Sequence, residues 1–214
     1  MRQRTAVLIS GRGSNLAALL AAARDPAFPA KIALVVCNQP GAPGLAVAVA
    51  AGVPALVVDH RAFDRDRAAH EAAIQAELER HRIAIVCLAG YMRVLTPFLV
   101  GCWAGRMLNI HPSLLPAFPG LDTHARALAV GVKLHGCTVH LVTEAVDDGT
   151  ILAQAAVPVL PGDTADVLAA RVLAQEHVIY PLALRRFAAP AERAVPPPAS
   201  AALLNPLPGA IERP

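Results

Sequence analysis

The sequence predicts an α/β protein with a single open, mostly parallel twisted sheet that is flanked by helices and becomes mixed, partly antiparallel, in its C-terminal part. Three observations predict this fold. Short β-branched runs alternate with longer alanine-rich segments in the first half, which is the pattern of βαβ units. These runs are continuously apolar, as in strands that are buried on both faces. After residue 105 two apolar runs follow each other closely, which favours an antiparallel pair.

The elements of the first half are predicted to alternate strictly. Strands are expected at 5–10, 31–38, 54–60 and 83–90, and helices at 14–25, 42–52 and 63–82. The last helix is the clearest, because charged residues occupy one side while Ala, Ile and Leu recur at helical spacing on the other. Such alternation gives a parallel sheet with helices on both faces.

The second half is predicted to close the sheet in a different way. A strand is expected at 106–111, a helix at 121–131 that ends at Gly131, a strand pair at 135–144 and 150–160, and a long helix at 164–188. Thr164 is a suitable cap for that helix, and Pro181 predicts a kink or a break in it. We therefore expect one domain over 1–188. Residues 189–214 are rich in Pro and Ala and are expected to be a tail without helix or sheet.

The composition narrows the class of protein. The chain has 214 residues, 55% of them hydrophobic, and a mean hydropathy of +0.47, which is typical of one globular domain. The net charge of +3 is scattered, so nucleic acid is not an expected partner. Four cysteines without a CxxC pair favour a reducing, cytoplasmic location. No apolar run approaches the ~18 residues of a membrane span, so no membrane association is expected.

The segment "ISGRGSNL" between the first strand and the first helix is a candidate anion site. Gly11 and Gly13 permit unusual backbone angles, and the amides of Ser14 and Asn15 can surround an anion at the helix N-terminus. No Gly-Lys-Ser/Thr follows, Leu16 replaces the third glycine of a dinucleotide fingerprint, and the second strand ends without an acidic residue. A phosphate monoester therefore fits better than a dinucleotide. The alternative is a tight turn with a Ser/Asn cap.

Polar residues also follow two later strands. "LNIHPSLLP" places Asn109 and His111 at the end of an apolar strand, and Pro112 restricts His111 to an extended backbone. In "LAGYMRVL", Gly90 permits close approach of a ligand at the carboxyl edge of the sheet, where open α/β folds bind ligands. Arg93 follows a short apolar segment. The alternatives are a strand end satisfied by backbone groups and a helix start with an exposed Arg.

The loop "TEAVDDG" carries Glu144, Asp147 and Asp148 between the paired strands. Most acidic loops are solvated turns, but a carboxylate that reaches His111 would orient its ring and favour the imidazolium.

Metal binding is not expected. His135 and His140 should face opposite sides of a strand, and the Asp122–His124 pair has no further ligands.

Taken together, these motifs resemble the phosphoribosylglycinamide formyltransferase family, folate-dependent enzymes of purine synthesis. The matching segments span residues 5–188 and include "VLISGRGSNL", "CLAGYMRVLTP", "AGRMLNIHPSLLPAFPGLDTHARAL", "HGCTVHLVTEAVDDGTILAQAAVPV" and "QEHVIYPL". The resemblance implies a formyltransferase-like fold with a Rossmann-type N-terminal half. It also implies transfer of a formyl group from the co-substrate 10-formyltetrahydrofolate to the amine of N1-(5-phospho-D-ribosyl)glycinamide, without a metal.

The resemblance assigns roles to individual residues. It implies a catalytic trio of Asn109, His111 and Asp147. It implies that the phosphoribosylglycinamide is bound by Gly13, Ser14, Asn15 and Glu176. It implies that the folate is bordered by Arg67, Met92, Arg93, Val94, Leu95 and Asn109. The expected partners are small molecules, with neither nucleic acid nor membrane, and the expected state is a monomer or a weak homodimer.

Departures from the family pattern are few. Asp122 stands where the family usually has a second His, and Asp148 where it usually has Gly. An extra residue in "FDRDRAAH" leaves either Arg67 or Arg65 to face the folate, and we align Arg67.

Three other functions remain as alternatives. Methionyl-tRNA formyltransferase and formyltetrahydrofolate deformylase share the core, but they usually carry a C-terminal RNA-binding domain and an N-terminal regulatory domain respectively. Neither of these additional domains is expected in this chain. A phosphate-binding module without catalysis would keep "GRGSN" but would have no use for the trio.

Overall fold

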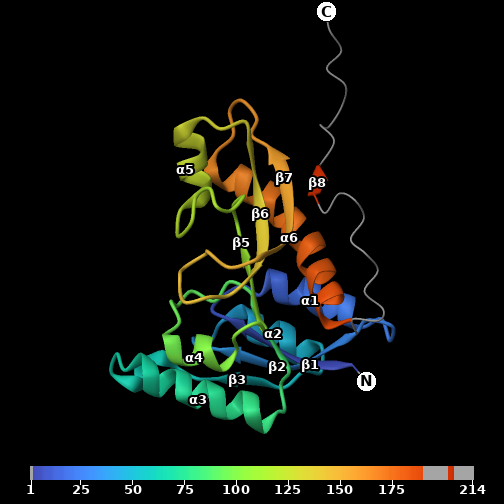
Figure 1. The fold of residues 1–214 in the computed structure, drawn as a ribbon, viewed down its shortest axis with the longest axis vertical. Coiled ribbons are helices and arrows are strands. Elements are labelled where there is room, and N and C mark those ends of the chain that lie inside the picture. Colours follow the sequence, from blue (N-terminus) through green and yellow to red (C-terminus); the bar gives the residue numbers. More distant parts are fainter. Residues whose placement is uncertain (1, 190–201, 205–214) are drawn as a thin grey trace, which may run out of the picture.

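The computed structural model describes residues 2–189 and 202–204. Within these residues one eight-stranded sheet has the order β3-β2-β1-β4-β5-β6-β7-β8 (Figure 1). The strands are β1 (Gln3–Ile9), β2 (Ala30–Cys37), β3 (Ala55–Val57), β4 (Ile85–Leu88), β5 (Met107–His111), β6 (Leu134–Leu141), β7 (Ile151–Pro158) and β8 (Ala202–Leu204). The helices are α1 (Ser14–Ala23), α2 (Pro43–Ala50), α3 (Arg67–Arg80), α4 (Pro97–Cys102), α5 (Thr123–Val130) and α6 (Ala165–Ala188), with a 3-10 helix η1 (His60–Phe63) before α3.

The sheet is parallel from β3 to β5 and antiparallel at β5–β6 and β6–β7. The predicted α/β class and the mixed C-terminal end are therefore confirmed. The first five strands are parallel, and a helix connects each of them to the next, whereas β6 and β7 are joined directly by the loop 142–150. In this register β6 ends beside the start of β5, where the Val142 amide donates to the Met107 carbonyl, and the loop 142–150 then folds back along β5 so that Asp147 lies beside His111.

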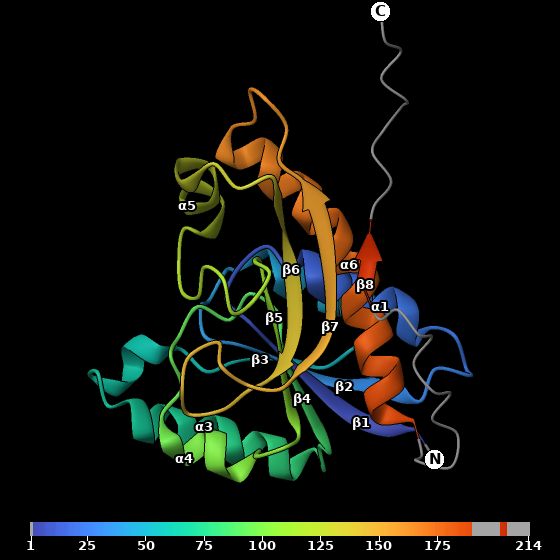
Figure 2. The same cartoon turned by 45° about the horizontal axis from the view of Figure 1, so that its top comes forward.

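Two layers of helices cover the sheet, and β1 shows why its sequence is continuously apolar. Val7 and Ile9 pack in the core that includes residues of α1 and α6, whereas Ala6 and Leu8 pack in the core that includes residues of α3 and α4. Figure 2 shows α3 and α4 together on one side of the sheet and α1 and α6 on the other. A strand buried on both faces cannot alternate apolar with polar residues.

Three local features differ from the sequence expectation. The helix expected at 63–82 is divided into η1 and α3, because Asp64 and Arg65 take positive φ angles of 43° and 70° and Asp66 then caps α3 by accepting from the Ala69 amide. The short helix α4 was not predicted. Thr164 caps α6 as expected. However, α6 continues through Pro181 to Ala188, so the prediction of a break at Pro181 is wrong.

The tail and the last helix also require corrections. Residues 202–204 form β8, which pairs in parallel with β7, contrary to the expectation of a tail without sheet. The rest of the tail, residues 190–201 and 205–214, lies outside the described residues. An 18-residue window of α6 reaches a mean hydropathy of 1.2, enough in length and composition to cross a membrane. In this fold, however, α6 supplies buried side chains such as Leu168, Val172 and Leu184 to the core.

Candidate active site

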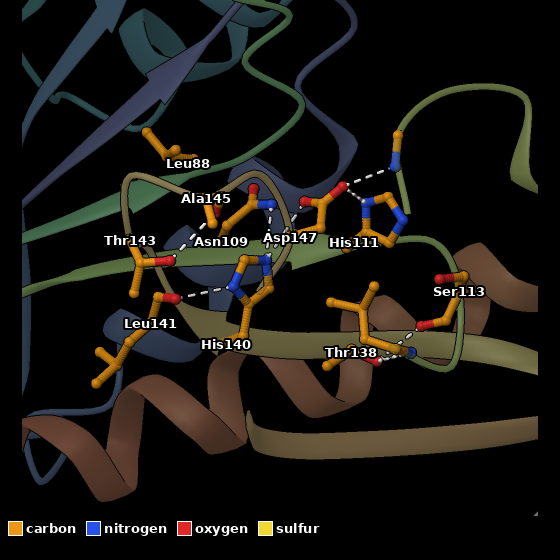
Figure 3. A network of polar contacts seen from close by, with 12 residues as sticks. Leu88, Asn109, His111, Ser113, Thr138, His140, Leu141, Thr143, Ala145 and Asp147 are labelled. Atoms are coloured by element: carbon orange, nitrogen blue, oxygen red, sulfur yellow. Dashed lines mark hydrogen bonds and ion pairs between the residues drawn. The ribbon is translucent and has the colours of Figure 1, made fainter. Parts of the chain in front are cut away.

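Asn109 and His111 point to the same face of β5, because residues two apart on a strand share a face. In the antiparallel register with β6, Asn109 lies opposite His140 and His111 lies opposite Thr138. His111 is 5% exposed. The strand end thus presents an amide and an imidazole side by side (Figure 3).

Asp147 reaches this pair from the loop 142–150. Its Oδ2 lies 3.3 Å from His111 Nδ1 and accepts a hydrogen bond from the Gly120 amide at 2.8 Å, and its Oδ1 lies 3.6 Å from His140 Nε2 (Figure 3). The loop folds back closely at Gly149, where a Cβ atom would collide with the Leu141 carbonyl oxygen. Asp148 is exposed. The geometry therefore selects Asp147 over its neighbour as the partner of His111.

Asp147 is ionised at neutral pH. Burial acts to raise the pKa of Asp147, but the contact with His140, the hydrogen bond from the Gly120 amide and the contact with His111 outweigh it and lower this pKa below its usual value. His111 Nε2 lies 3.0 Å from the Phe118 carbonyl oxygen. Both ring nitrogens of His111 therefore face oxygen acceptors, an arrangement that the doubly protonated imidazolium satisfies.

His140 belongs to the same network, a role that the sequence interpretation missed. Its Nδ1 lies 2.9 Å from the Leu141 carbonyl, which assigns the proton of the neutral ring to Nδ1. In this neutral form Nε2 accepts from Asn109 Nδ2, 3.2 Å away, whereas a protonated Nε2 would face the Asp147 carboxylate, 3.6 Å away. His140 thus orients the Asn109 amide and leaves its second N–H available. The antiparallel register of β5 and β6 is the signal that could have found it.

His124 and His135 form a separate pair. His135 Nε2 lies 3.2 Å from His124 Nδ1, and burial, with a smaller effect of His124, lowers the pKa of His135 to about 4. Asp122 precedes α5 with a left-handed backbone and makes no side-chain cap. Over residues 2–189 and 202–204, no group of three or more His, Cys, Asp or Glu side chains is arranged to hold a metal ion.

The glycine-containing loop forms the second part of the site. Gly13 has a φ of +76°, and a Cβ atom on it would come within 2.7 Å of Gly44 Cα. Only glycine fits this close approach without strain. Ser14 begins α1, and Asn15 Nδ2 donates to Glu176 Oε2 of α6 at 2.6 Å. Asn15 Oδ1 is buried without a partner in the described part of the chain.

Glu176 is 7% exposed. Burial raises the pKa of Glu176, and the hydrogen bond from Asn15 offsets only part of that effect. Glu176→Gln should therefore have a higher melting temperature than the wild type at pH 8. The folded state binds the proton more tightly, so the stability of the wild type falls as pH rises from about 4.3, the usual carboxyl value, through the raised pKa.

Melting curves from pH 4 to pH 9 test this prediction. The difference between Glu176→Gln and wild type should grow with pH, whereas Asp166→Asn, at an exposed position of the same helix, should show no such growth. A difference that stays constant or shrinks with rising pH would contradict it.

The residues expected to border the folate lie in two places. Met92, Arg93, Val94 and Leu95 connect β4 to α4, with the Met92 and Val94 side chains 64% and 56% exposed. Arg67 is the exposed first residue of α3, and Arg65 is also exposed in the turn before it. Both arginines are therefore accessible to a ligand at the start of α3.

The fold and this site define a class of protein. An open α/β sheet carries an amide, an imidazole and an ionised carboxylate at one strand end, beside a glycine-containing helix start. Such an arrangement suits a group-transfer enzyme, because an amide and an imidazole can donate to a developing oxyanion and no nucleophilic side chain is needed.

Comparisons with known proteins identify the family. The formyl transferase family model matches residues 3–184, so the chain belongs to the formyl transferase family. Phosphoribosylglycinamide formyltransferase of Escherichia coli is 45% identical over 182 residues, which cover 85% of each chain. The crystal structure of phosphoribosylglycinamide formyltransferase from Brucella melitensis is 57% identical with a TM-score of 0.84, over 89% of this chain and 97% of that one. The resemblance expected from the sequence is confirmed.

Longer proteins also match. The trifunctional purine biosynthetic protein adenosine-3 of Drosophila melanogaster is 50% identical over 86% of this chain, and that of Homo sapiens 49% identical over the same share. This chain spans only 14% and 18% of their respective lengths.

Proposed function

We propose that this chain transfers the formyl group of 10-formyltetrahydrofolate to the amine of N1-(5-phospho-D-ribosyl)glycinamide, in de novo purine biosynthesis. The products are formylglycinamide ribonucleotide and tetrahydrofolate. The observation that carries the proposal is the network of Asn109, His111 and Asp147 at the end of β5. The names of the relatives that match most of the chain support it.

The reaction needs a stabilised oxyanion. The substrate amine attacks the formyl carbon, a C–N bond forms, and negative charge collects on the carbonyl oxygen. The free N–H of Asn109 and an N–H of His111 are the donors for this oxygen, and such donors typically contribute ~3 kcal/mol each to transition-state stabilisation. His111 Nε2 contacts the Phe118 carbonyl, so it must exchange that acceptor for the formyl oxygen.

The reaction also moves a proton. The attacking nitrogen loses a proton, and the folate nitrogen gains one as its bond to the formyl carbon breaks. Asp147, ionised and in contact with His111 and His140, keeps the His111 imidazolium oriented and serves as the base in this transfer. No covalent intermediate is required.

The two substrates are assigned to opposite sides of the network. Gly13, Ser14 and Asn15 at the start of α1 hold the phosphate, where backbone amides and the positive end of the helix dipole favour an anion. Glu176, paired with Asn15, contacts the same substrate. The folate lies along Met92–Leu95, with Arg67 at its border.

One assay tests the proposed function. Purified protein is mixed with glycinamide ribonucleotide and 10-formyltetrahydrofolate, and released tetrahydrofolate is followed. Turnover that requires both substrates supports the proposal. Release of tetrahydrofolate and formate without the ribonucleotide would instead indicate deformylation, and binding of phosphate esters without turnover would indicate a binding module.

Ser14→Ala is expected to raise KM for glycinamide ribonucleotide severalfold and to leave the affinity for a folate analogue nearly unchanged. The reason is that it removes a phosphate donor remote from the carbonyl. Gly13→Val should have a larger effect, because its Cβ would collide with Gly44. Titration calorimetry with each ligand makes the measurement, and Ser200→Ala, at a serine to which the proposal gives no role, serves as the control. An equal loss of folate affinity would argue against the assignment.

The proposal includes a cytoplasmic location, small-molecule partners alone, and a monomer or weak homodimer. Light scattering across a range of protein concentrations tests the last point. A stable larger oligomer would contradict it.

A further inference from the structure

Ser10 joins three strand ends through one buried hydroxyl group. Ser10 directly follows β1 and precedes the glycine-containing loop. Its Oγ donates to Asn38 Oδ1 at 2.6 Å and accepts from the Met92 amide at 2.8 Å. Ser10 is 6% exposed and Asn38 1% exposed. This hydroxyl therefore connects the start of the phosphate loop to the segment assigned to the folate.

The folate segment is held at its two ends by side chains from other elements. At one end, the Met92 amide donates to Ser10. At the other, Thr96 donates from its amide and its hydroxyl to the two carboxylate oxygens of Glu71, at 2.8 and 2.5 Å. Glu71 belongs to α3 and is 3% exposed. Residues 93–95 lie between these two attachments without helix or strand structure.

The backbone of Ser10 is fixed independently of its hydroxyl. The Ser10 amide donates to the Gly90 carbonyl at 3.2 Å, and the Asn38 amide donates to the Ile9 carbonyl at 3.4 Å. Loss of the hydroxyl would thus leave the loop backbone attached to the sheet. It would leave the Met92 N–H and Asn38 Oδ1 without this partner, and unpaired buried polar groups are unfavourable.

We infer that Ser10 is a positioning residue for folate binding, acting through the Met92 amide on the segment 92–95. The inference rests on the proposed function. It predicts that loss of the Ser10 hydroxyl weakens folate binding but not binding of the ribonucleotide. The reason is that the hydroxyl contacts the folate segment, while the phosphate loop keeps its backbone hydrogen bonds.

The test is Ser10→Ala in the full-length chain. KM for 10-formyltetrahydrofolate and the Kd of an unreactive 10-deaza folate analogue should rise about tenfold, the size expected for one lost buried hydrogen bond. KM for glycinamide ribonucleotide should stay within about twofold. Thr5→Val is the matched control, because it removes a buried hydroxyl group within β1, the strand that Ser10 follows, and among the described residues this hydroxyl hydrogen-bonds only to the Gln3 carbonyl. It should change neither constant.

Ser10→Cys provides a second variant if Ser10→Ala folds poorly. The thiol is larger than the hydroxyl but fills the site and only weakly donates and accepts hydrogen bonds, so folate affinity should again fall while the affinity for glycinamide ribonucleotide is kept. Equal changes for both substrates, or unchanged folate affinity with a lowered melting temperature, would overturn the inference. An inactive wild type would instead overturn the proposed function, and this inference with it.

Discussion

Asn109→Ala and His111→Ala are each expected to lower kcat by roughly 100-fold or more, while the fold stays intact. Both side chains are assigned to the oxygen that gains charge in the transition state, so their loss should affect kcat more than KM. The Asn109 amide is oriented by His140 and the His111 ring by Asp147. Little rearrangement would then be needed as charge develops, and preorganised donors contribute most under that condition.

Steady-state kinetics with both substrates saturating provides the measurement, and circular dichroism checks the fold. His81→Ala is a suitable control. His81 is a partly buried histidine at the end of α3 whose Nδ1 contacts the Glu77 carbonyl, and it has no assigned role in the site. It should keep the wild-type kcat. Near wild-type turnover in either Asn109→Ala or His111→Ala would refute the oxyanion role.

Asp147→Asn should lower kcat by roughly 100-fold, the lower range for loss of a general base. Asparagine keeps the size of the side chain but removes the charge that holds the His111 imidazolium. The pKa of Asp147 lies below its usual value, so the wild-type charge is lost only as pH falls through that lowered value. The wild-type carboxylate is therefore present throughout the range from about pH 6 to pH 9, well above carboxyl pKa values, and the variant should be deficient over this whole range.

Asp148→Asn is the matched control, because it removes the adjacent, exposed carboxylate. It should keep nearly wild-type activity. The stability of Asp147→Asn should also fall at neutral pH. A lowered pKa means that the carboxylate stabilises the fold above about pH 4, and this contribution disappears at lower pH. A sharp loss of activity in Asp148→Asn alone would show that the wrong acid has been assigned.

The fold could be predicted from local patterns. Continuous apolar runs in β1 and β2 indicated strands covered on both faces, and the close succession of β6 and β7 indicated an antiparallel pair. These features are readable because burial and chain connectivity leave periodic signals in the sequence. The division between η1 and α3 could not be predicted from such patterns. It depends on positive φ angles at Asp64 and Arg65, which residues other than glycine adopt only in particular surroundings.

Residue types and spacing determined the fold class, the glycine-containing helix start and the family resemblance, and this resemblance implied the trio of Asn109, His111 and Asp147. Only the tertiary structure shows that Asp147, and not Asp148, contacts His111, and that His140 joins them. The physical reason is that these contacts link residues about 30 positions apart through the register of β5 and β6 and the return of the loop at Gly149. The sequence specifies the side chains of such a network. A one-residue change in the register of one strand, however, would move the side chains of that strand to the opposite face of the sheet.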